Sequence, residues 1–146
     1  MIGKRYRRRA AHKGQANDTG TAKRAGTADA EGLVDAYFEA WNDPDPVRRA
    51  ALLQETVSDE VVFVGPTGRL TGRDQLLDTI VEARELLPGA TVARVGSVEV
   101  DDGIRLCWEA RGPEGKRLAA GCEVINVAAD GRIGQIMVAL GSDTVL

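Results

Sequence analysis

The chain has 146 residues, of which 43% are hydrophobic and 28% are charged, and its formal net charge is −3. These values are typical of one soluble domain that is long enough to bury a core. The sequence has no apolar run near the roughly 18 residues of a membrane span and no apolar segment of a secretory signal, so we expect a cytoplasmic protein without a membrane partner.

The charge is divided unevenly between a basic N-terminal segment and an acidic remainder. The first 30 residues hold eight Lys and Arg against two Asp, and the rest of the chain holds eleven against twenty. Residues 1–28 have few apolar side chains to offset the entropy of folding, so we predict a basic, flexible tail before a single domain at 29–146. The cluster at 4–9 has the charge to touch nucleic acid or an anionic surface. A tail that is solvated, or folded back on the acidic domain, is the favoured interpretation, and we expect no nucleic-acid partner.

Helices are predicted first along the domain. From about residue 29, apolar residues recur on one face of an amphipathic helix: Leu33, Val34, Tyr37, Phe38 and Trp41. This helix should end near Asn42, because Pro44 pushes the residue before it out of the α region. Pro46 then suits the first position of a second helix, which runs to about Glu55. A third helix is predicted over 73–87, where leucines and an isoleucine share one face.

Strands are predicted at 61–64 and then throughout the C-terminal part of the domain. Runs rich in β-branched residues, separated by hairpin signals, span 91–100, 104–111, 117–127 and 132–140. Helices followed by an antiparallel meander indicate an α+β fold.

The hairpin turns assign residues to the two faces of the meander, because directly opposed residues of an antiparallel pair share a face. Turns centred at 114–115 and 130–131 place Leu106 opposite Glu123 and Trp108 opposite Gly121. The same register places Glu123 opposite Val138. One face is then apolar, with Glu123 as its only charge. A carboxylate in such surroundings should have a raised pKa, which suits a general base.

Two cysteines fall on the opposite, mixed face, where Cys107 should lie across from Cys122. They form neither a CxxC pair nor a dense secreted framework. We therefore expect reduced, buried thiols rather than a disulfide.

Several short motifs, taken in order, resemble the nuclear transport factor 2-like superfamily, and within it the SnoaL-like bacterial proteins. The resemblance covers about residues 31–141 and rests on Tyr37-Phe-Glu-Ala-Trp-Asn42, Arg49-Ala-Ala-Leu-Leu53, Val62-Phe-Val-Gly-Pro66, Leu70-Thr-Gly-Arg73, Trp108, Gly115, Gly121-Cys-Glu123 and Asp130-Gly-Arg-Ile133. It implies a cone-shaped fold, in which a curved antiparallel sheet wraps around three N-terminal helices and a pocket. It also implies a homodimer that meets through the sheet.

Two positions depart from the pattern of this family. Many relatives have Asp at the position of Gly65, and Asp rather than Glu at the position of Glu123. The family includes ketosteroid isomerases, polyketide cyclases, dehydratases and epoxide hydrolases, and also members without known catalysis, so the fold does not decide the function.

Glu123 is the candidate catalytic residue, able to take a proton from a carbon next to a carbonyl. Tyr37 and the indoles of Trp41 and Trp108 are candidate donors to the resulting enolate. The candidate residues for binding a small apolar or aromatic molecule are Tyr37, Trp41, Phe63, Leu106, Trp108 and Val138. The alternative is that Glu123 pairs with an arginine or lies in water at the pocket mouth, and that the aromatic residues simply pack in the core.

No metal site or cofactor is expected. The single histidine, His12, lies in the tail, and the Gly65–Gly68 segment lacks the Lys and Ser/Thr that end a phosphate loop. Two functions remain open: a cofactor-independent isomerase, cyclase or dehydratase, or a non-catalytic ligand-binding or dimerisation module.

Overall fold

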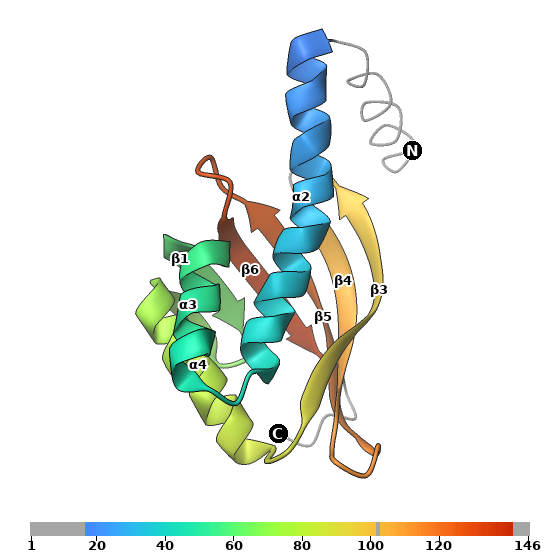
Figure 1. Cartoon of the computed structure of the whole chain (residues 1–146). Helices are drawn as coiled ribbons and strands as arrows, with labels where there is room; N and C mark the ends of the chain where they lie inside the picture. Colours follow the sequence, from blue (N-terminus) through green and yellow to red (C-terminus); the bar gives the residue numbers. More distant parts are fainter. Residues whose placement is uncertain (1–16, 102, 142–146) are drawn as a thin grey trace.

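The computed structural model describes residues 17–101 and 103–141, and it combines helices with one curved, six-stranded sheet (Figure 1). The elements in chain order are α2 (Asn17–Asn42), α3 (Pro46–Thr56), β1 (Val57–Gly65), β2 (Gly68–Thr71), α4 (Arg73–Leu86), β3 (Thr91–Val100), β4 (Gly103–Arg111), β5 (Arg117–Val127) and β6 (Ile133–Leu140). The predicted α+β fold, with helices before a curved sheet, is confirmed. The short strand β2 was not predicted.

The strands are arranged in the order β2-β1-β6-β5-β4-β3. The last four form the predicted antiparallel meander, with each of the predicted pairs around Glu123 in register. The expectation of an antiparallel sheet is wrong for one pair, because β1 and β6 run parallel. No hairpin constrains these two strands, since β2, α4, β3, β4 and β5 lie between them in the chain.

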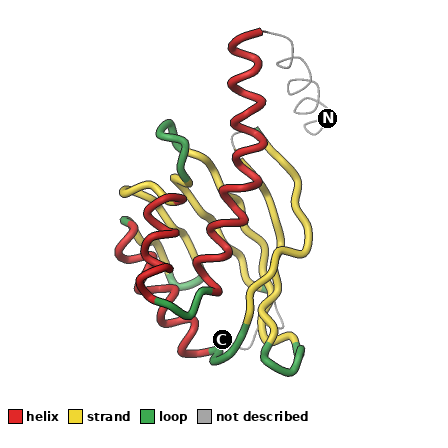
Figure 2. The backbone as a smooth tube through the Cα atoms, viewed as in Figure 1, coloured by secondary structure: helices red, strands yellow, loops and turns green. Residues whose placement is uncertain are grey.

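Helix α2 crosses the concave face of the sheet, and its first turns project beyond the strands (Figures 1 and 2). Its buried residues follow the predicted stripe and include Val34, Tyr37 and Phe38. The helix begins well before the predicted residue 29, so the boundary proposed at 28 lies inside it. Residues 1–16, with the basic cluster and His12, lie outside the described residues, and the flexibility of the tail stays a prediction.

Helix α2 is the longest helix of the described segments, with 26 residues. Neither it nor any other helix within residues 17–101 and 103–141 is apolar enough over a sufficient length to cross a membrane.

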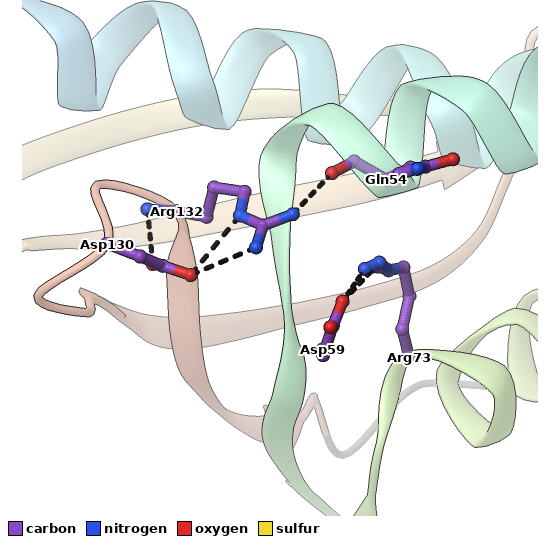
Figure 3. Close-up of polar contacts among 5 residues, drawn as sticks. All are labelled: Gln54, Asp59, Arg73, Asp130 and Arg132. Carbon is purple, nitrogen blue, oxygen red and sulfur yellow. Dashed lines mark hydrogen bonds and ion pairs between the residues drawn. The ribbon is translucent and has the colours of Figure 1, made fainter.

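Arginine side chains join the helices to the strands at the β1 side of the sheet (Figure 3). Arg132, in the turn between β5 and β6, donates to the main-chain oxygen of Gln54 at 2.8 Å and also bonds the Asp130 carboxylate. Arg73, the first residue of α4, pairs with Asp59 of β1. These contacts hold α3 and α4 against the part of the sheet where β1 runs beside β6.

Cys107 and Cys122 form a disulfide across β4 and β5, so the prediction of reduced, buried thiols is wrong. The register that places them opposite each other is as predicted. Cys122 is exposed and Cys107 is half-buried, because both lie on the convex face of the sheet that the helices leave uncovered. Sequence spacing predicts their position correctly, whereas composition does not distinguish two thiols from a disulfide at this position.

Candidate functional site

Glu123 lies in the middle of β5 and points toward the helix-covered face of the sheet. Across the strands it is directly opposite Leu106 of β4 and Val138 of β6, as the hairpin turns predicted. Only 7% of its surface is exposed, and among the described residues it is a buried polar group together with Arg49 and Thr56. The carboxyl group is therefore held among apolar strands beneath α2.

The aromatic stripe of α2 covers this part of the sheet. Tyr37 is 1% exposed, and its ring makes edge contacts with Phe38 at 5.7 Å and with Trp41 at 6.5 Å between ring centroids. Aromatic pairs favour such edge-to-face geometry. The sequence predicts these rings on one face of the helix, and in the structure the helix packs against β3 and β4.

The C-terminal end of α2 is fixed by two arginine side chains from other helices and by its own Asn42, which bonds to a strand. Arg84 of α4 donates to the main-chain oxygen of Trp41 at 2.7 Å, and the buried Arg49 of α3 donates to that of Asp43 at 2.8 Å. The Asn42 amide exchanges two hydrogen bonds of 2.8 Å with the backbone of Val92 in β3. Cations at a helix C-terminus bond its free carbonyl groups and oppose its dipole. The anchoring sets the position of Tyr37 and Trp41 relative to the sheet.

Trp108 of β4 occupies the position diagonal to Glu123, directly opposite Gly121. Its indole lies so close to the Gly121 backbone that a Cβ atom there would come within 2.7 Å of Trp108 Cζ2 and 2.8 Å of the Ala139 oxygen. Glycine at 121 is therefore what allows the indole to rest on β5 beside Glu123.

Two polar atoms of this cluster are buried without a hydrogen-bond partner among the described residues: Glu123 Oε1 and Trp108 Nε1. The indole N–H nevertheless lies near enough to favour the ionised carboxylate. We conclude that the two groups are neighbours without the alignment of an ordinary hydrogen bond. A buried polar atom without a partner is costly, so these atoms are the ones that a ligand or a water molecule would satisfy.

Burial raises the pKa of the Glu123 carboxyl to about 7, and the nearby indole N–H of Trp108 opposes this only in part. Burial also raises the pKa of the Tyr37 phenol well above its usual value, and the charge of Glu123 adds to the effect, while the Trp41 side chain opposes it. Tyr37 is therefore close to Glu123 and stays a neutral phenol near pH 7. No ion pair with arginine forms at Glu123 within the described residues, contrary to the alternative that the sequence left open.

The remaining predicted binding residues belong to the same apolar cluster. Phe63 and Leu106 are buried in it, and Trp41, Trp108 and Val138 pack against it half-buried. Phe63 faces Ile136 of β6, and its ring lies beside Gly65, where a Cβ atom would approach Phe63 Cε1 to 3.0 Å. The structure thus brings all seven predicted site residues to one side of the sheet.

A pocket that the sequence did not reveal lies at the corner between α2 and α3. It has a volume of about 540 Å³ and is lined by Glu39, Asn42, Asp43, Pro44, Arg48, Ala51, Leu52 and Glu55. Glu123 is not among these residues, so this pocket is separate from the carboxyl site. Side chains capable of holding a metal ion do not gather in groups of three or more anywhere in the described ranges.

The sequence of the domain identifies its family. Residues 34–136 match the model of the SnoaL-like domain, which is well over half of the chain. The chain belongs to the SnoaL-like family. The resemblance of the motifs to SnoaL-like bacterial proteins is thereby confirmed.

Solved structures of similar fold include a candidate isomerase of the SnoaL-like family from Agrobacterium tumefaciens, with a TM-score of 0.73 and 24% identity over 79% of this chain and 99% of that one. A candidate polyketide cyclase from Sinorhizobium meliloti has a TM-score of 0.62 and 19% identity, over 77% of this chain and 98% of that one. A protein with a cystatin-like fold from Methylobium petroleophilum has a TM-score of 0.64 and 20% identity, over 80% and 78%. At these identities the likeness shows the fold alone. A search of curated proteins by sequence found no significant match.

Proposed function

We propose that this SnoaL-like protein binds a small, uncharged molecule and uses Glu123 as an acid or base in a cofactor-independent isomerisation, cyclisation or dehydration. One observation carries the proposal: Glu123 is buried, its Oε1 atom has no partner in the described structure, and its pKa is raised to about 7. Structural carboxylates are ordinarily paired or exposed. A carboxyl group poised to gain or lose a proton at neutral pH is suited to acid–base chemistry.

The proposed chemistry uses the neighbours of Glu123 in distinct roles. The ionised carboxylate would take a proton from a carbon next to a carbonyl group, and the acid so formed would return it elsewhere on the same molecule. Trp108 Nε1, which is buried and unpartnered, is the proposed donor to the oxygen that becomes negative. The Tyr37 phenol is the second candidate donor, because it remains protonated beside Glu123.

The surroundings of the carboxyl favour an apolar or aromatic ligand. Leu106, Trp108 and Val138 flank Glu123 on the sheet, and the rings of α2 lie above it. An ionised ligand would lose its hydration among these side chains without an ion pair to replace it. The candidate isomerase and the candidate cyclase of similar fold agree with this class of chemistry, although their likeness to this chain extends only to the fold.

A second function, that of a non-catalytic ligand-binding or dimerisation module, is favoured by the close packing around Glu123. Tyr37, Leu106 and Ile125 are each at most 2% exposed, which is the packing of an interior filled by its own side chains. In this case Glu123 would act through its neutral form as a hydrogen-bond donor to a bound molecule.

A homodimer formed through the convex face of the sheet is proposed for either function. Met137 is 46% exposed at the middle of this face, and Cys122 and Val124 lie beside it on β5. Glu109 and Arg111 form an ion pair nearer the edge, which is the polar rim expected around such a contact. Burial of this apolar centre in a symmetric contact would remove it from water.

The test compares the wild-type protein with Glu123→Gln against a panel of hydrophobic ketones and phenols. Glu123→Gln keeps the shape of the side chain and removes the titrating group. Glu114→Gln, which changes an exposed residue of the β4–β5 turn, is the matched control. If Glu123 acts as a catalytic base, turnover should rise as pH increases through about 7. Turnover should also be lost in Glu123→Gln and kept in Glu114→Gln. Binding of the panel without turnover by the wild type would support the module, and turnover by Glu123→Gln at the wild-type rate would refute a catalytic role.

A further inference from the structure

Trp41 lies one helical turn after Tyr37 on the buried stripe of α2. Their ring centroids are 6.5 Å apart, and the rings are nearly perpendicular, at 86°. Residues four apart on a helix are neighbours on one face, and both side chains belong to the apolar cluster of the core. Tyr37 is only 1% exposed, whereas Trp41 is half-buried. Because the phenol is enclosed, its hydroxyl group depends on partners within the site rather than on bulk water.

The backbone at Trp41 is held from two sides, independently of the indole N–H group. Arg84 donates to the main-chain oxygen of Trp41 at 2.7 Å, and the amide of the next residue, Asn42, exchanges two hydrogen bonds with Val92 of β3. These contacts fix the point from which the side chain leaves the helix. An aromatic side chain without an N–H group would therefore be held in the same place.

The donors and acceptors of the two rings combine in one way only. An indole N–H can only donate, whereas a phenol hydroxyl both donates and accepts. The Trp41 N–H lies near enough to the Tyr37 oxygen to oppose the rise in the pKa of this phenol, and the charge of Glu123 adds to that rise. Glu123 is the one charged group within the described residues that shifts the pKa of Tyr37. Since two donors cannot bond each other, the phenol accepts from Trp41 and keeps its own hydrogen for another acceptor.

We propose that Trp41 is a positioning residue: its indole N–H bonds the Tyr37 oxygen and so directs the phenol hydrogen to an oxygen atom of the ligand. Trp41 has this role only if a molecule with a carbonyl or hydroxyl oxygen occupies the site beside Glu123, as the proposed function requires. Trp41 then acts on the ligand through Tyr37 rather than as a direct donor, and Trp108 donates separately from the sheet.

The indole also strengthens the phenol as a donor. Hydrogen bonds in series polarise one another, and a bond accepted by the phenol oxygen makes its hydrogen more positive. Loss of the Trp41 N–H should therefore weaken the bond from Tyr37 to a ligand oxygen while the phenol itself remains in place. A ligand of the same shape without an oxygen atom should not respond to this loss.

The first measurement needs no ligand and follows the exchange of the Trp41 indole proton with water by NMR. Trp41→Phe lacks this signal and so assigns it between the two tryptophans of the chain. Tyr37→Phe removes the phenol oxygen and should make the exchange faster. Phe38→Leu is the matched control, because it removes the other ring in edge contact with Tyr37, at 5.7 Å, and leaves the oxygen untouched. Equal rates in the wild type and Tyr37→Phe, or the same increase in both variants, would refute the hydrogen bond.

The second measurement is a double-mutant cycle on binding, with acetophenone as the ketone and ethylbenzene as its counterpart without oxygen. Trp41→Phe should weaken the binding of acetophenone about two- to tenfold and leave that of ethylbenzene unchanged. In the Tyr37→Phe background the same change should have no further effect, because Trp41 acts through the phenol. Effects that multiply, or a wild-type affinity for acetophenone no greater than that of Tyr37→Phe, would overturn the role of Trp41.

The cycle separates this role from catalysis by Glu123. Coupled effects on binding in a protein that turns over no substrate would support the role of Trp41 and refute the catalytic function. Independent effects in a protein whose turnover is lost in Glu123→Gln would refute the role of Trp41 and leave the function of Glu123 intact. If turnover is found, Trp41→Phe should lower kcat more than it raises KM, because the bond to the ligand oxygen strengthens as that oxygen becomes negative.

Discussion

Replacement of Glu123 by Gln should make the protein more stable at high pH than the wild type. The pKa of the carboxyl rises from 4.5 to about 7 on folding, chiefly because burial disfavours its charged form. Each pKa unit corresponds to about 1.4 kcal/mol, so ionising Glu123 in the folded state costs about 3 kcal/mol of stability. The neutral amide of Gln avoids this cost.

The pH dependence has a definite direction. Between pH 4.5 and about 7 the folded protein holds a proton on Glu123 that the unfolded chain has released. The free energy of unfolding of the wild type therefore falls as pH rises through this range, and the penalty is complete above about 7. Relative to its value at pH 4, the advantage of Glu123→Gln should grow by about 3 kcal/mol at pH 8.

Urea unfolding at several pH values measures this difference directly, because the contributions of all other titrating groups cancel between the two proteins. Glu114→Gln, at an exposed position, should show no such pH-dependent difference. A wild type that is more stable than Glu123→Gln at pH 8 would mean that the carboxylate has a stabilising cationic partner. A difference that does not change with pH would show that Glu123 is not held in an apolar environment, and either result would refute the reasoning about the site.

Three further outcomes follow from the packing and the surface. Gly121→Ala should lower the free energy of unfolding in urea by about 1–3 kcal/mol, because its methyl group would meet Trp108 at 2.7 Å. Gly131→Ala is the comparison, because that turn glycine has a positive φ but open space around it, so that only backbone strain is tested there. Light scattering should give twice the 15.6 kDa chain mass, and Met137→Lys on the convex face should shift it toward the monomer, while a monomeric wild type would contradict the sheet-mediated dimer. Deletion of residues 1–28 should change the melting temperature by less than about 5 °C, and a larger loss would show that the tail or the first turns of α2 stabilise the domain.

The register of the meander could be predicted from the sequence because local signals determine it. Turn residues fixed the centres of two hairpins, and the alternation of side chains then placed Glu123 between Leu106 and Val138. The burial of Glu123 follows from the apolar residues that this register places around it. The stripe on α2 was equally local, since it depends only on the helical period.

Other features of the structure could not be predicted from the local sequence pattern. The start of α2 was placed too late, because the composition of the preceding residues indicated disorder and gave no start signal at Asn17. The parallel pairing of β1 with β6 joins segments about 70 residues apart that no turn connects. The pocket between α2 and α3 depends on the angle at which two helices meet, which the prolines at 44 and 46 signal but do not specify.

The glycine at position 65 has a consequence for the chemistry. At position 65, where many relatives have Asp, the Phe63 ring occupies the space beside the glycine, and no other carboxylate of the described residues affects the pKa of Glu123. One carboxyl group must then both remove and return the proton in any reaction at this site. Such an arrangement favours reactions in which the substrate recovers the proton it gave up, as in isomerisation, over hydrolysis, which needs a water molecule activated by one group and a leaving oxygen protonated by another. We therefore infer that, among the activities open to this fold, proton transfer within one substrate molecule is the one that this site is best built to perform.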